Sequence, residues 1–238
     1  MRIPPAPHRW HLTPRQAIAV QRRLADRVSI RSPLGAPRLI AGLDAAFSPD
    51  GMRCIAGVVL WDIGAQVLVE KHVASRPVTF PYVPGLLSFR EAPALLAALR
   101  KLCLTPDALM CDGQGLAHPR RFGIACHMGI LCGLPSIGCA KSRLIGDHDA
   151  PPFQRGSSAP LSDRGATIGA ALRTQAGVRP VYVSIGHLFD LETAIATVLA
   201  CSPRYRIPEP TRLADLLVAA AKRDIAPKRS RRDHRPAH

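Results

Sequence analysis

The sequence is poor in lysine, in acidic residues and in aromatic side chains, and it has no long hydrophobic run. Only 5 of its 32 basic residues are lysines, and 17 acidic residues leave a formal net charge of +15. No apolar run approaches the roughly 18 residues of a membrane span, and segment 1–10 (MRIPPAPHRW) lacks the apolar core of a signal peptide. We therefore expect a cytoplasmic protein without a membrane partner.

The cysteine pattern argues against two further classes. The 7 cysteines are an odd number and include no C-x-x-C pair, unlike a disulfide framework or a zinc site. Cys54, Cys111, Cys126 and Cys132 lie in apolar runs, where a free thiol behaves as a small hydrophobic side chain. These thiols suit a reducing compartment.

The basic excess indicates a polyanionic partner. Segment 226–238 holds five basic residues and one acid, so it supplies +4 of the +15 and leaves +11 on the rest. Basic chains attract nucleic acid through counterion release. The alternative is a solvated arginine-rich surface, because arginine bias can follow from coding composition alone.

The 238 residues and a hydrophobic content of 47% suit one α/β domain. We expect residues 1–12 to form an extended arm, residues 13–224 a single domain, and residues 225–238 a disordered basic tail. A capping box, Thr13 to Gln16 with Pro14 at the first helical position, predicts an opening helix. A monomer is expected.

Apolar patterns and turn signals predict the remaining elements. Short connections make the first three strands antiparallel neighbours. We expect strands at 39–47, 53–62 and 66–73, a helix capped by Ser88 through 102, a strand at 108–111, a helix at 122–132, a strand at 135–140, a hairpin around 167–174, a strand at 181–185, a helix through 199 and a helix at 213–222 capped by Thr211. This order is compatible with a ribonuclease-H-like mixed sheet flanked by helices.

The stretch 107–121 (DALMCDGQGLAHPRR) combines a buried strand with polar groups at its carboxyl end. Asp112 follows the strand directly, and Gly113 and Gly115 let the backbone approach a ligand closely. His118 and the two following arginines suit phosphate. Ligands collect outside such strand ends, although Asp-Gly is also a common turn dipeptide.

Asp44 interrupts the apolar pattern of the first strand, so its carboxylate either faces solvent or points to a site. In the expected sheet the first and fourth strands are neighbours, which lets Asp44 and Asp112 converge. Two adjacent carboxylates repel each other, and a hard divalent cation such as Mg²⁺ or Mn²⁺ neutralises them best. This arrangement predicts a metal site for phosphate chemistry.

Two further residues stand out. Pro81 and Pro84 stiffen a loop that presents the ring of Tyr82, which suits stacking or wedging unless the ring packs on its own surface. Glu91 is expected in the first turn of its helix, where an acid is ordinary helix-dipole chemistry.

Six segments together resemble the endonuclease V family, over roughly residues 13 to 224. They are AGLDAAF (41–47), PYVPGLLSFRE (81–91), CDGQGLAHPRRFGIACHMGI (111–130), IGCAKSRLIG (137–146), GATIGAALRTQAGVRPVYVSIGHLFDLETA (165–194) and RIPEPTRLAD (206–215). The resemblance implies a ribonuclease-H-like fold and a Mg²⁺-dependent nuclease, with Mn²⁺ as a substitute. It also implies nicking at the second phosphodiester bond 3′ to deoxyinosine, leaving 3′-hydroxyl and 5′-phosphate ends.

The resemblance also assigns roles to residues of this chain. Asp44 and Asp112 match metal-binding aspartates, and Glu91 matches the third acid of the catalytic cluster. His187 matches a fourth position near the active centre, and Lys141 a basic residue near the scissile phosphate. Tyr82 matches a wedge that fills the space of the extracted base. The expected DNA- and lesion-binding set is Tyr82, Gly85, Gly113, Gly115 and His118. Phe47 departs from the family, which frequently has Tyr there.

Two alternatives remain at this stage. One is a catalytically silent nucleic-acid-binding relative, which would be expected to have lost at least one of Asp44, Glu91, Asp112 and His187. The other is an inosine-specific endoribonuclease, because 2′-hydroxyl contacts depend on loop geometry.

Overall fold

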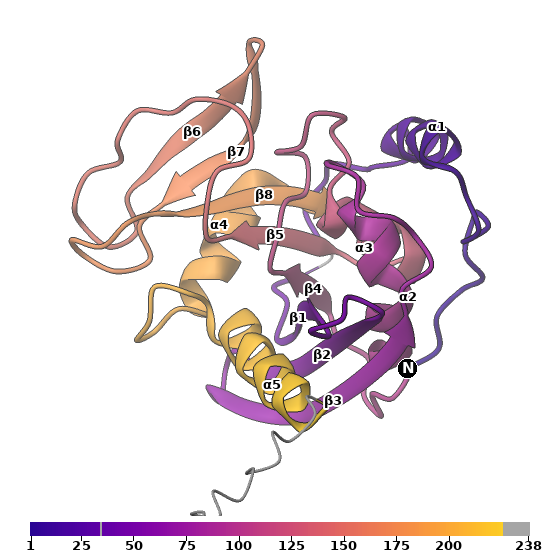
Figure 1. Cartoon of the computed structure of the whole chain (residues 1–238). Helices are drawn as coiled ribbons and strands as arrows, with labels where there is room; N and C mark the ends of the chain where they lie inside the picture. Colours follow the sequence, from indigo (N-terminus) through magenta and orange to yellow (C-terminus); the bar gives the residue numbers. More distant parts are fainter. Residues whose placement is uncertain (34, 226–238) are drawn as a thin grey trace, which may run out of the picture.

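The computed structural model describes residues 1–33 and 35–225, and within them eight strands form one mixed sheet. The strand order is β3-β2-β1-β4-β5-β8-β7-β6 (Figure 1). The strands are β1 Leu39–Phe47, β2 Arg53–Asp62, β3 Val67–Pro77, β4 Ala108–Cys111, β5 Ser136–Ala140, β6 Ser158–Asp163, β7 Ala166–Leu172 and β8 Val181–His187. The first three meander antiparallel, β4 and β5 run parallel to β1, and β8 runs antiparallel to β5.

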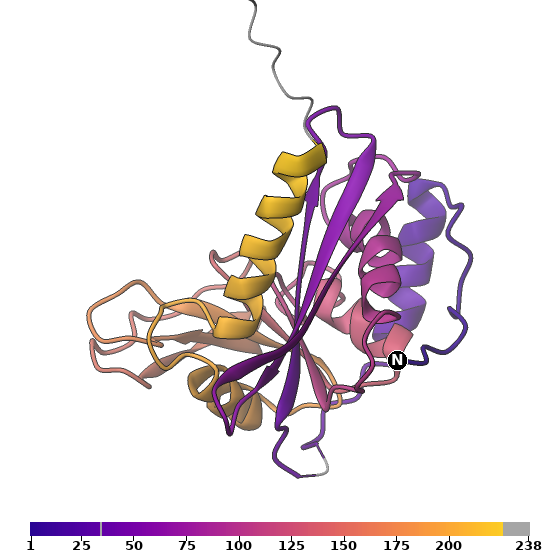
Figure 2. The ribbon, with the colours of Figure 1, turned by 90° about the horizontal axis from the view of Figure 1, so that it is seen from below.

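Helices cover both faces of this sheet (Figure 2). On one face lie α1 Pro14–Ala25, α2 Leu87–Leu99 and α3 Ile124–Cys132, and on the other lie α4 Leu191–Ala200 and α5 Glu209–Ile225. The apolar faces of β1 and β2 pack with α2 and α3, while β4, β5 and β8 pack with α4. The predicted mixed α/β architecture is therefore confirmed.

Of three predicted helix-capping residues, the structure confirms one and contradicts two. The capping box of Thr13 and Gln16 is present at α1. The prediction that Ser88 caps α2 is wrong, because the helix begins at Leu87 and Ser88 lies buried inside it. Thr211 does not cap α5 either: that helix begins at Glu209, and the Thr211 hydroxyl donates to the Pro208 carbonyl.

Two of the boundary differences change how predicted residues and elements are interpreted. Because α2 begins at Leu87, Glu91 lies beyond its first turn, and the helix dipole is not the reason for this acid. The predicted hairpin around 167–174 exists but spans residues 158–172, with its turn at Arg164 and Gly165. A positive φ at both turn residues, 54° and 76°, sets this tight connection.

The N-terminal residues pack on the domain without forming a helix or strand. The Met1 amine donates to the Leu102 carbonyl, and His8 Nε2 lies 2.8 Å from His127 Nε2. Trp10 lies against the core that α2 and α3 share with the sheet. Residues 226–238 of the predicted basic tail lie outside the described residues.

The helices of the described segments 1–33 and 35–225 include none with the length and hydropathy that crossing a membrane requires.

Candidate active site

Asp44 and Asp112 are brought together by the register of two parallel strands. Leu43 in β1 pairs with Cys111 in β4, and the Asp112 amide donates to the Leu43 carbonyl at 3.0 Å. Asp112 therefore leaves β4 beside Asp44, which is half-buried in the middle of the long strand β1. The predicted convergence of these two carboxylates follows from this pairing.

Glu91 adds a third acid to the cluster from α2. Burial, followed by the charges of Asp44 and Asp112, raises the pKa of Glu91 to about 8. Burial, followed by the charges of Asp112 and Asp215, raises the pKa of Asp44 to about 7. Glu91 therefore holds a proton at neutral pH and Asp44 is near the midpoint of its titration, chiefly because both groups are buried and secondly because they lie among other carboxylates.

Lys141 supplies part of the missing positive charge. Its Nζ lies 2.7 Å from Asp112 Oδ2 and 3.6 Å from Asp215 Oδ2. Burial lowers the pKa of Lys141, but the hydrogen bond to Asp112 and the charges of Asp112, Asp215 and Asp44 outweigh it and raise that pKa. The ammonium group is thus held charged between two carboxylates.

Asp215 is the site residue that sequence reasoning missed. It lies on α5, and its side chain is 51% exposed. The helix reaches the sheet closely because Gly42 has no side chain: a Cβ there would lie 2.2 Å from the Pro210 backbone. Asp215 belongs to the segment RIPEPTRLAD, but an exposed helical acid is indistinguishable from a surface charge in sequence.

His187, by contrast, is not brought to the carboxylates, and its predicted place at the active centre is corrected. It pairs with Ser136 at the start of β5, whereas Lys141 follows the end of β5. The Ser29 amide donates to its Nδ1 at 3.2 Å. Burial, followed by the charges of Arg31 and Arg27, lowers the pKa of His187. Asp215 replaces it in the cluster.

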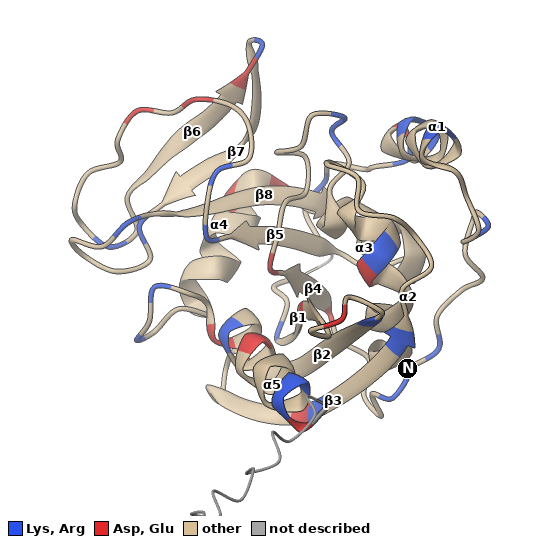
Figure 3. Cartoon of the chain, in the orientation of Figure 1, with Lys and Arg blue, Asp and Glu red and all other residues tan. Residues whose placement is uncertain are grey.

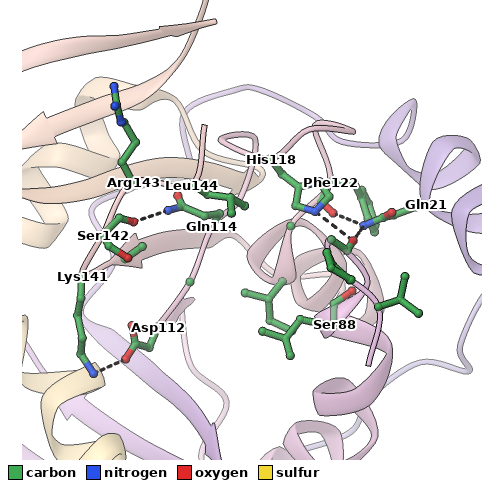
Figure 4. Close-up of a pocket in the computed structure, with 18 of the residues that line it drawn as sticks. Gln21, Ser88, Asp112, Gln114, His118, Phe122, Lys141, Ser142, Arg143 and Leu144 are labelled. Carbon is green, nitrogen blue, oxygen red and sulfur yellow. Dashed lines mark hydrogen bonds and ion pairs between the residues drawn. The ribbon is translucent and has the colours of Figure 1, made fainter. Parts of the chain in front are cut away.

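A pocket of about 490 Å³ opens directly beside Asp112 and Lys141 (Figure 4). It is lined by the loop before α2, the loop after β4 and the segment after β5. One wall is fixed by Gln114, whose Nε2 donates to the Ser142 carbonyl at 3.0 Å. The Oε1 of Gln114 is buried and has no donor among the described residues.

The Gly85 carbonyl anchors the opposite end of the pocket. It accepts hydrogen bonds from Gln21 Nε2 at 2.9 Å, His118 Nε2 at 3.1 Å and Arg120 Nη2 at 2.7 Å. Gly85 has a φ of 77°, and a Cβ there would lie 2.5 Å from Arg120 Nη2. Glycine is therefore required at this turn.

His118 is a neutral wall of the pocket. Its Nδ1 accepts from the Arg120 amide at 3.1 Å, so its Nε2 carries the proton that it donates to Gly85. Burial, followed by the charge of Arg120, lowers the pKa of His118 to about 4. At neutral pH this imidazole offers no positive charge to a phosphate, and its role in the fold is to hold the loop.

The two other predicted glycines have different places. Gly113 lines the pocket and faces Ile124, whose Cγ2 a Cβ would approach to 2.7 Å. Gly115 does not line it: its amide donates to Ser184 Oγ at 2.8 Å, and a Cβ would lie 2.0 Å from the Ile185 carbonyl oxygen. Gly115 is therefore a packing position against β8.

Tyr82 stands at the rim of the pocket. Its residue is 71% exposed, which excludes the alternative of a ring packed away on its own surface. The guanidinium of Arg90 lies 5.7 Å from the centre of the ring. The aromatic ring is thus exposed to solvent at the rim of the same pocket that Asp112 lines.

The donor chemistry of the cluster fits a hard divalent cation. Asp44, Asp112 and Asp215 supply carboxylate oxygens, and the charges of neighbouring carboxylates contribute, after burial, to the raised pKa of Asp44 and of Glu91. Within the described residues, however, no group of three His, Cys, Asp or Glu side chains is gathered closely enough to hold a metal ion. The site is an open set of oxygen ligands with Lys141 between two of them.

A basic surface adjoins the far side of the pocket wall. Arg22 and Arg23 at the end of α1, Arg120 and Arg121 after β4, and Arg164 at the tip of the β6-β7 hairpin line one open cleft. Figure 3 shows several Lys and Arg positions on α1 and one basic segment, next to an acidic one, at that tip. Arg121 is paired with Asp163 at 2.6 Å and Asp26 also lines the cleft, so these two acids compensate only part of its positive charge. Such a surface attracts phosphates.

Comparison with known proteins places this site in a family. The family model of endonuclease V matches residues 22–216. The chain is 52% identical to an endonuclease V of Roseiflexus castenholzii over 219 residues, which cover 92% of this chain and 98% of that one. The crystal structure of endonuclease V from Streptomyces avermitilis matches with a TM-score of 0.88 and 45% identity, covering 92% and 97% of the two chains.

A more distant relative has been solved with nucleic acid. Endonuclease V of Ciona intestinalis, in complex with a 24-mer DNA containing an inosine followed by a ribo-adenosine, matches with a TM-score of 0.76 and 25% identity, covering 89% and 98%. The solved endonuclease V structures confirm the ribonuclease-H-like fold class. The chain therefore belongs to the endonuclease V family, whose members are metal-dependent nucleases that hydrolyse phosphodiester bonds.

Proposed function

We propose that this protein repairs deaminated DNA by nicking the strand at the second phosphodiester bond 3′ to deoxyinosine, with Mg²⁺ and leaving 3′-hydroxyl and 5′-phosphate ends. The observation that carries the proposal is the pocket of about 490 Å³ that opens on Asp112 and Lys141, with Tyr82 at its rim. A pocket for a single base beside phosphate-cleaving groups is the arrangement that base flipping requires. The position of the cut rests on the family resemblance.

The relative from Ciona intestinalis supports inosine as the recognised base, because that protein was solved with inosine-containing DNA. The pocket of this chain adds a reason of its own. The buried Oε1 of Gln114 lacks a donor among the described residues, and the lactam N–H of hypoxanthine could supply one. Adenine has an acceptor at the same ring position, so an acceptor in the wall disfavours it.

Flipping and wedging together explain selection of a damaged base. A deaminated base pairs more weakly, so extracting it costs less than extracting a normal one. The exposed ring of Tyr82 can then occupy the gap in the stack, and Pro81 and Pro84 hold it there at a small entropic cost.

The residues of this chain divide the chemistry among them. Asp44, Asp112 and Asp215 would hold the divalent cation, which supplies Lewis-acid polarisation of the phosphate and acidification of a water. Lys141 neutralises charge on the phosphate from its position against Asp112. Glu91, once positive charge at the cluster lowers its pKa, is a carboxylate that can orient the attacking water and accept its proton.

Inosine-containing RNA is a second candidate substrate. The Ciona intestinalis complex carries a ribo-adenosine directly after the inosine, so a ribonucleotide at that position is compatible with a relative's site. A silent binding protein is disfavoured, because Asp44, Glu91, Asp112, Asp215 and Lys141 are all present around one point.

The test is cleavage of matched duplexes that contain inosine or adenine at one position, and of the corresponding RNA strands. We expect nicking of inosine DNA at the stated bond with Mg²⁺ or Mn²⁺, and none with EDTA. Replacing Mg²⁺ with Ca²⁺ should permit binding without cleavage. Cleavage that persists in EDTA, or that ignores the inosine, would refute the proposal, and preferential cutting of RNA would select the second candidate.

A further inference from the structure

Arg90 is an unusual charged residue beside the proposed wedge. It lies on α2 immediately before Glu91 and is half-buried. Its Nε is buried without a hydrogen-bond acceptor, and no carboxylate among the described residues forms an ion pair with its guanidinium. Burying Nε without an acceptor is costly, whereas the terminal nitrogens of Arg90 are not buried in this way and remain open to a ligand.

Two aromatic rings determine where this guanidinium lies. Its central carbon is 4.3 Å from the ring centre of Phe47 and 5.7 Å from that of Tyr82. Phe47 ends β1, the strand that carries Asp44. The guanidinium of Arg90 therefore contacts the ring of Phe47 through a cation–π interaction and lies within reach of the exposed ring of Tyr82.

The other ring-stacked arginines in the described part of the chain show what a structural arginine looks like. Arg173 lies over Phe153 and donates to the Pro151 and Val178 carbonyls. Arg212 lies over Tyr205 and is paired with Glu209 at 2.6 Å. Both arginines donate to acceptors within the protein. Arg90 also contacts aromatic rings, but its buried Nε has no acceptor among the described residues.

We propose that Arg90 binds a phosphodiester of the DNA strand that enters the site and, at the same time, positions the ring of Tyr82. This inference rests on the proposed function. A guanidinium is planar, stacks on aromatic rings and forms paired hydrogen bonds with phosphate oxygens, so one group serves both tasks. Lysine keeps the charge but has no plane to stack.

The experiment measures binding of Arg90→Met and Arg90→Lys to an inosine duplex and to the same duplex without inosine. Ca²⁺ replaces Mg²⁺ to prevent cleavage, and anisotropy of a labelled strand is recorded over a series of salt concentrations. Arg100→Met is the matched control, because it removes the same charge from the exposed end of α2, about 15 Å away along the helix.

Arg90→Met should lower the slope of log Kd against log salt by about 1 on both duplexes, as expected for one lost phosphate contact. It should also weaken binding to the inosine duplex about tenfold. Arg90→Lys should retain the salt slope. Its inosine preference should nevertheless fall about as much as that of Arg90→Met. Arg100→Met should change the inosine preference less than twofold. Because lysine keeps both charge and stem, its result decides the positioning role even where the Met variant is unstable.

A double-mutant cycle with Tyr82→Ala isolates the positioning role. If Arg90 acts through the ring, the double variant should lose less inosine preference than the product of the two single losses. An unchanged salt slope in Arg90→Met together with multiplicative losses would overturn the inference. A wild-type protein without inosine preference would refute the proposed function instead, while the salt slope on plain duplex would still decide the phosphate contact.

Discussion

Lys141 Nζ lies 2.7 Å from Asp112 Oδ2, so the first charge at the end of β4 is already paired before any substrate arrives. The same ammonium is 3.6 Å from Asp215 Oδ2. A bound phosphate and a divalent cation would compete for these partners, the phosphate for Lys141 and the cation for the aspartates. The ion pair therefore holds both groups in position for a reaction that separates them.

Asp112→Asn should abolish nicking and leave the fold and lesion binding largely intact. The substitution removes the charge that a divalent cation needs but keeps the side-chain volume. Single-turnover cleavage of an inosine duplex in Mg²⁺ and binding in Ca²⁺ measure the two properties separately. Asp44→Asn should behave alike, and near-wild-type turnover in either variant would mean that the carboxylate site is wrong.

Asp215→Asn should impair nicking strongly although the side chain is 51% exposed. Surface acids far from a site usually change little, but this one faces Lys141 and contributes to the raised pKa of Asp44. Asp224→Asn, an exposed acid further along α5, is the matched control. Equal activity of the two variants would show that Asp215 is a surface acid without a role in cleavage.

How far the sequence predicts this site depends on strand direction. Asp44 and Asp112 were predictable, because a meander followed by a crossover places β1 beside β4. His187 was expected near the same site because the segment that contains it resembles the endonuclease V family. Strand β8 runs antiparallel to β5, so His187 at the end of β8 lies beside the start of β5 and away from Lys141, which follows the end of β5. A local pattern predicts that a strand exists but not its direction.

Helix docking sets a second limit. Asp215 reaches Lys141 only because α5 crosses β1 over Gly42, where a Cβ would lie 2.2 Å from Pro210. That close approach joins residues far apart in sequence, and no periodicity encodes it. The prediction that Ser88 caps a helix is wrong because of the same limit. The Ser88 hydroxyl lies 3.0 Å from His127 Nδ1 on α3, a contact that exists only once the helices pack.

The hydrogen-bonded pair of half-buried His8 and buried His127 predicts acid sensitivity of the fold. His8 Nδ1 lies 2.7 Å from the Arg9 carbonyl and must donate to it, so His127 Nε2 donates to His8 Nε2 and His127 Nδ1 accepts from Ser88 Oγ. This chain of hydrogen bonds requires both imidazole rings to be neutral. Burial, followed by the charge of His8, lowers the pKa of His127 to about 3.

The sign follows from proton counting. Between about 6.5, the ordinary histidine pKa, and 3 the unfolded chain binds more protons than the folded one, so the free energy of unfolding decreases as the pH is lowered through that window. The stabilisation associated with neutral His127 is fully present above pH 6.5, and its loss should amount to a few kcal/mol, to order of magnitude, by pH 3. Urea titrations should show a smaller acid loss in His127→Gln than in wild type, while His11→Gln, an exposed control on the same arm, should follow wild type. Parallel curves for all three would contradict the neutral chain.

Tyr82 gives the prediction that depends on the loop and not on the carboxylates. Its ring is 71% exposed at the pocket rim, and base stacking on an aromatic side chain is worth roughly 1 to 3 kcal/mol. Tyr82→Ala should therefore weaken binding to an inosine duplex by about ten- to a hundredfold. Tyr82→Phe should retain most of the affinity, because the wedge uses the ring face and not the hydroxyl.

Single-stranded substrate separates a wedge from a general contact. An inosine that is already unpaired and unstacked leaves no gap in a duplex stack, so Tyr82→Ala should lose much less affinity there than on duplex. Binding of both variants to matched duplex and single strands in Ca²⁺ measures the difference. Equal losses on the two substrates, or a Phe variant as weak as Ala, would show that the exposed ring contacts nucleic acid without filling the vacated position.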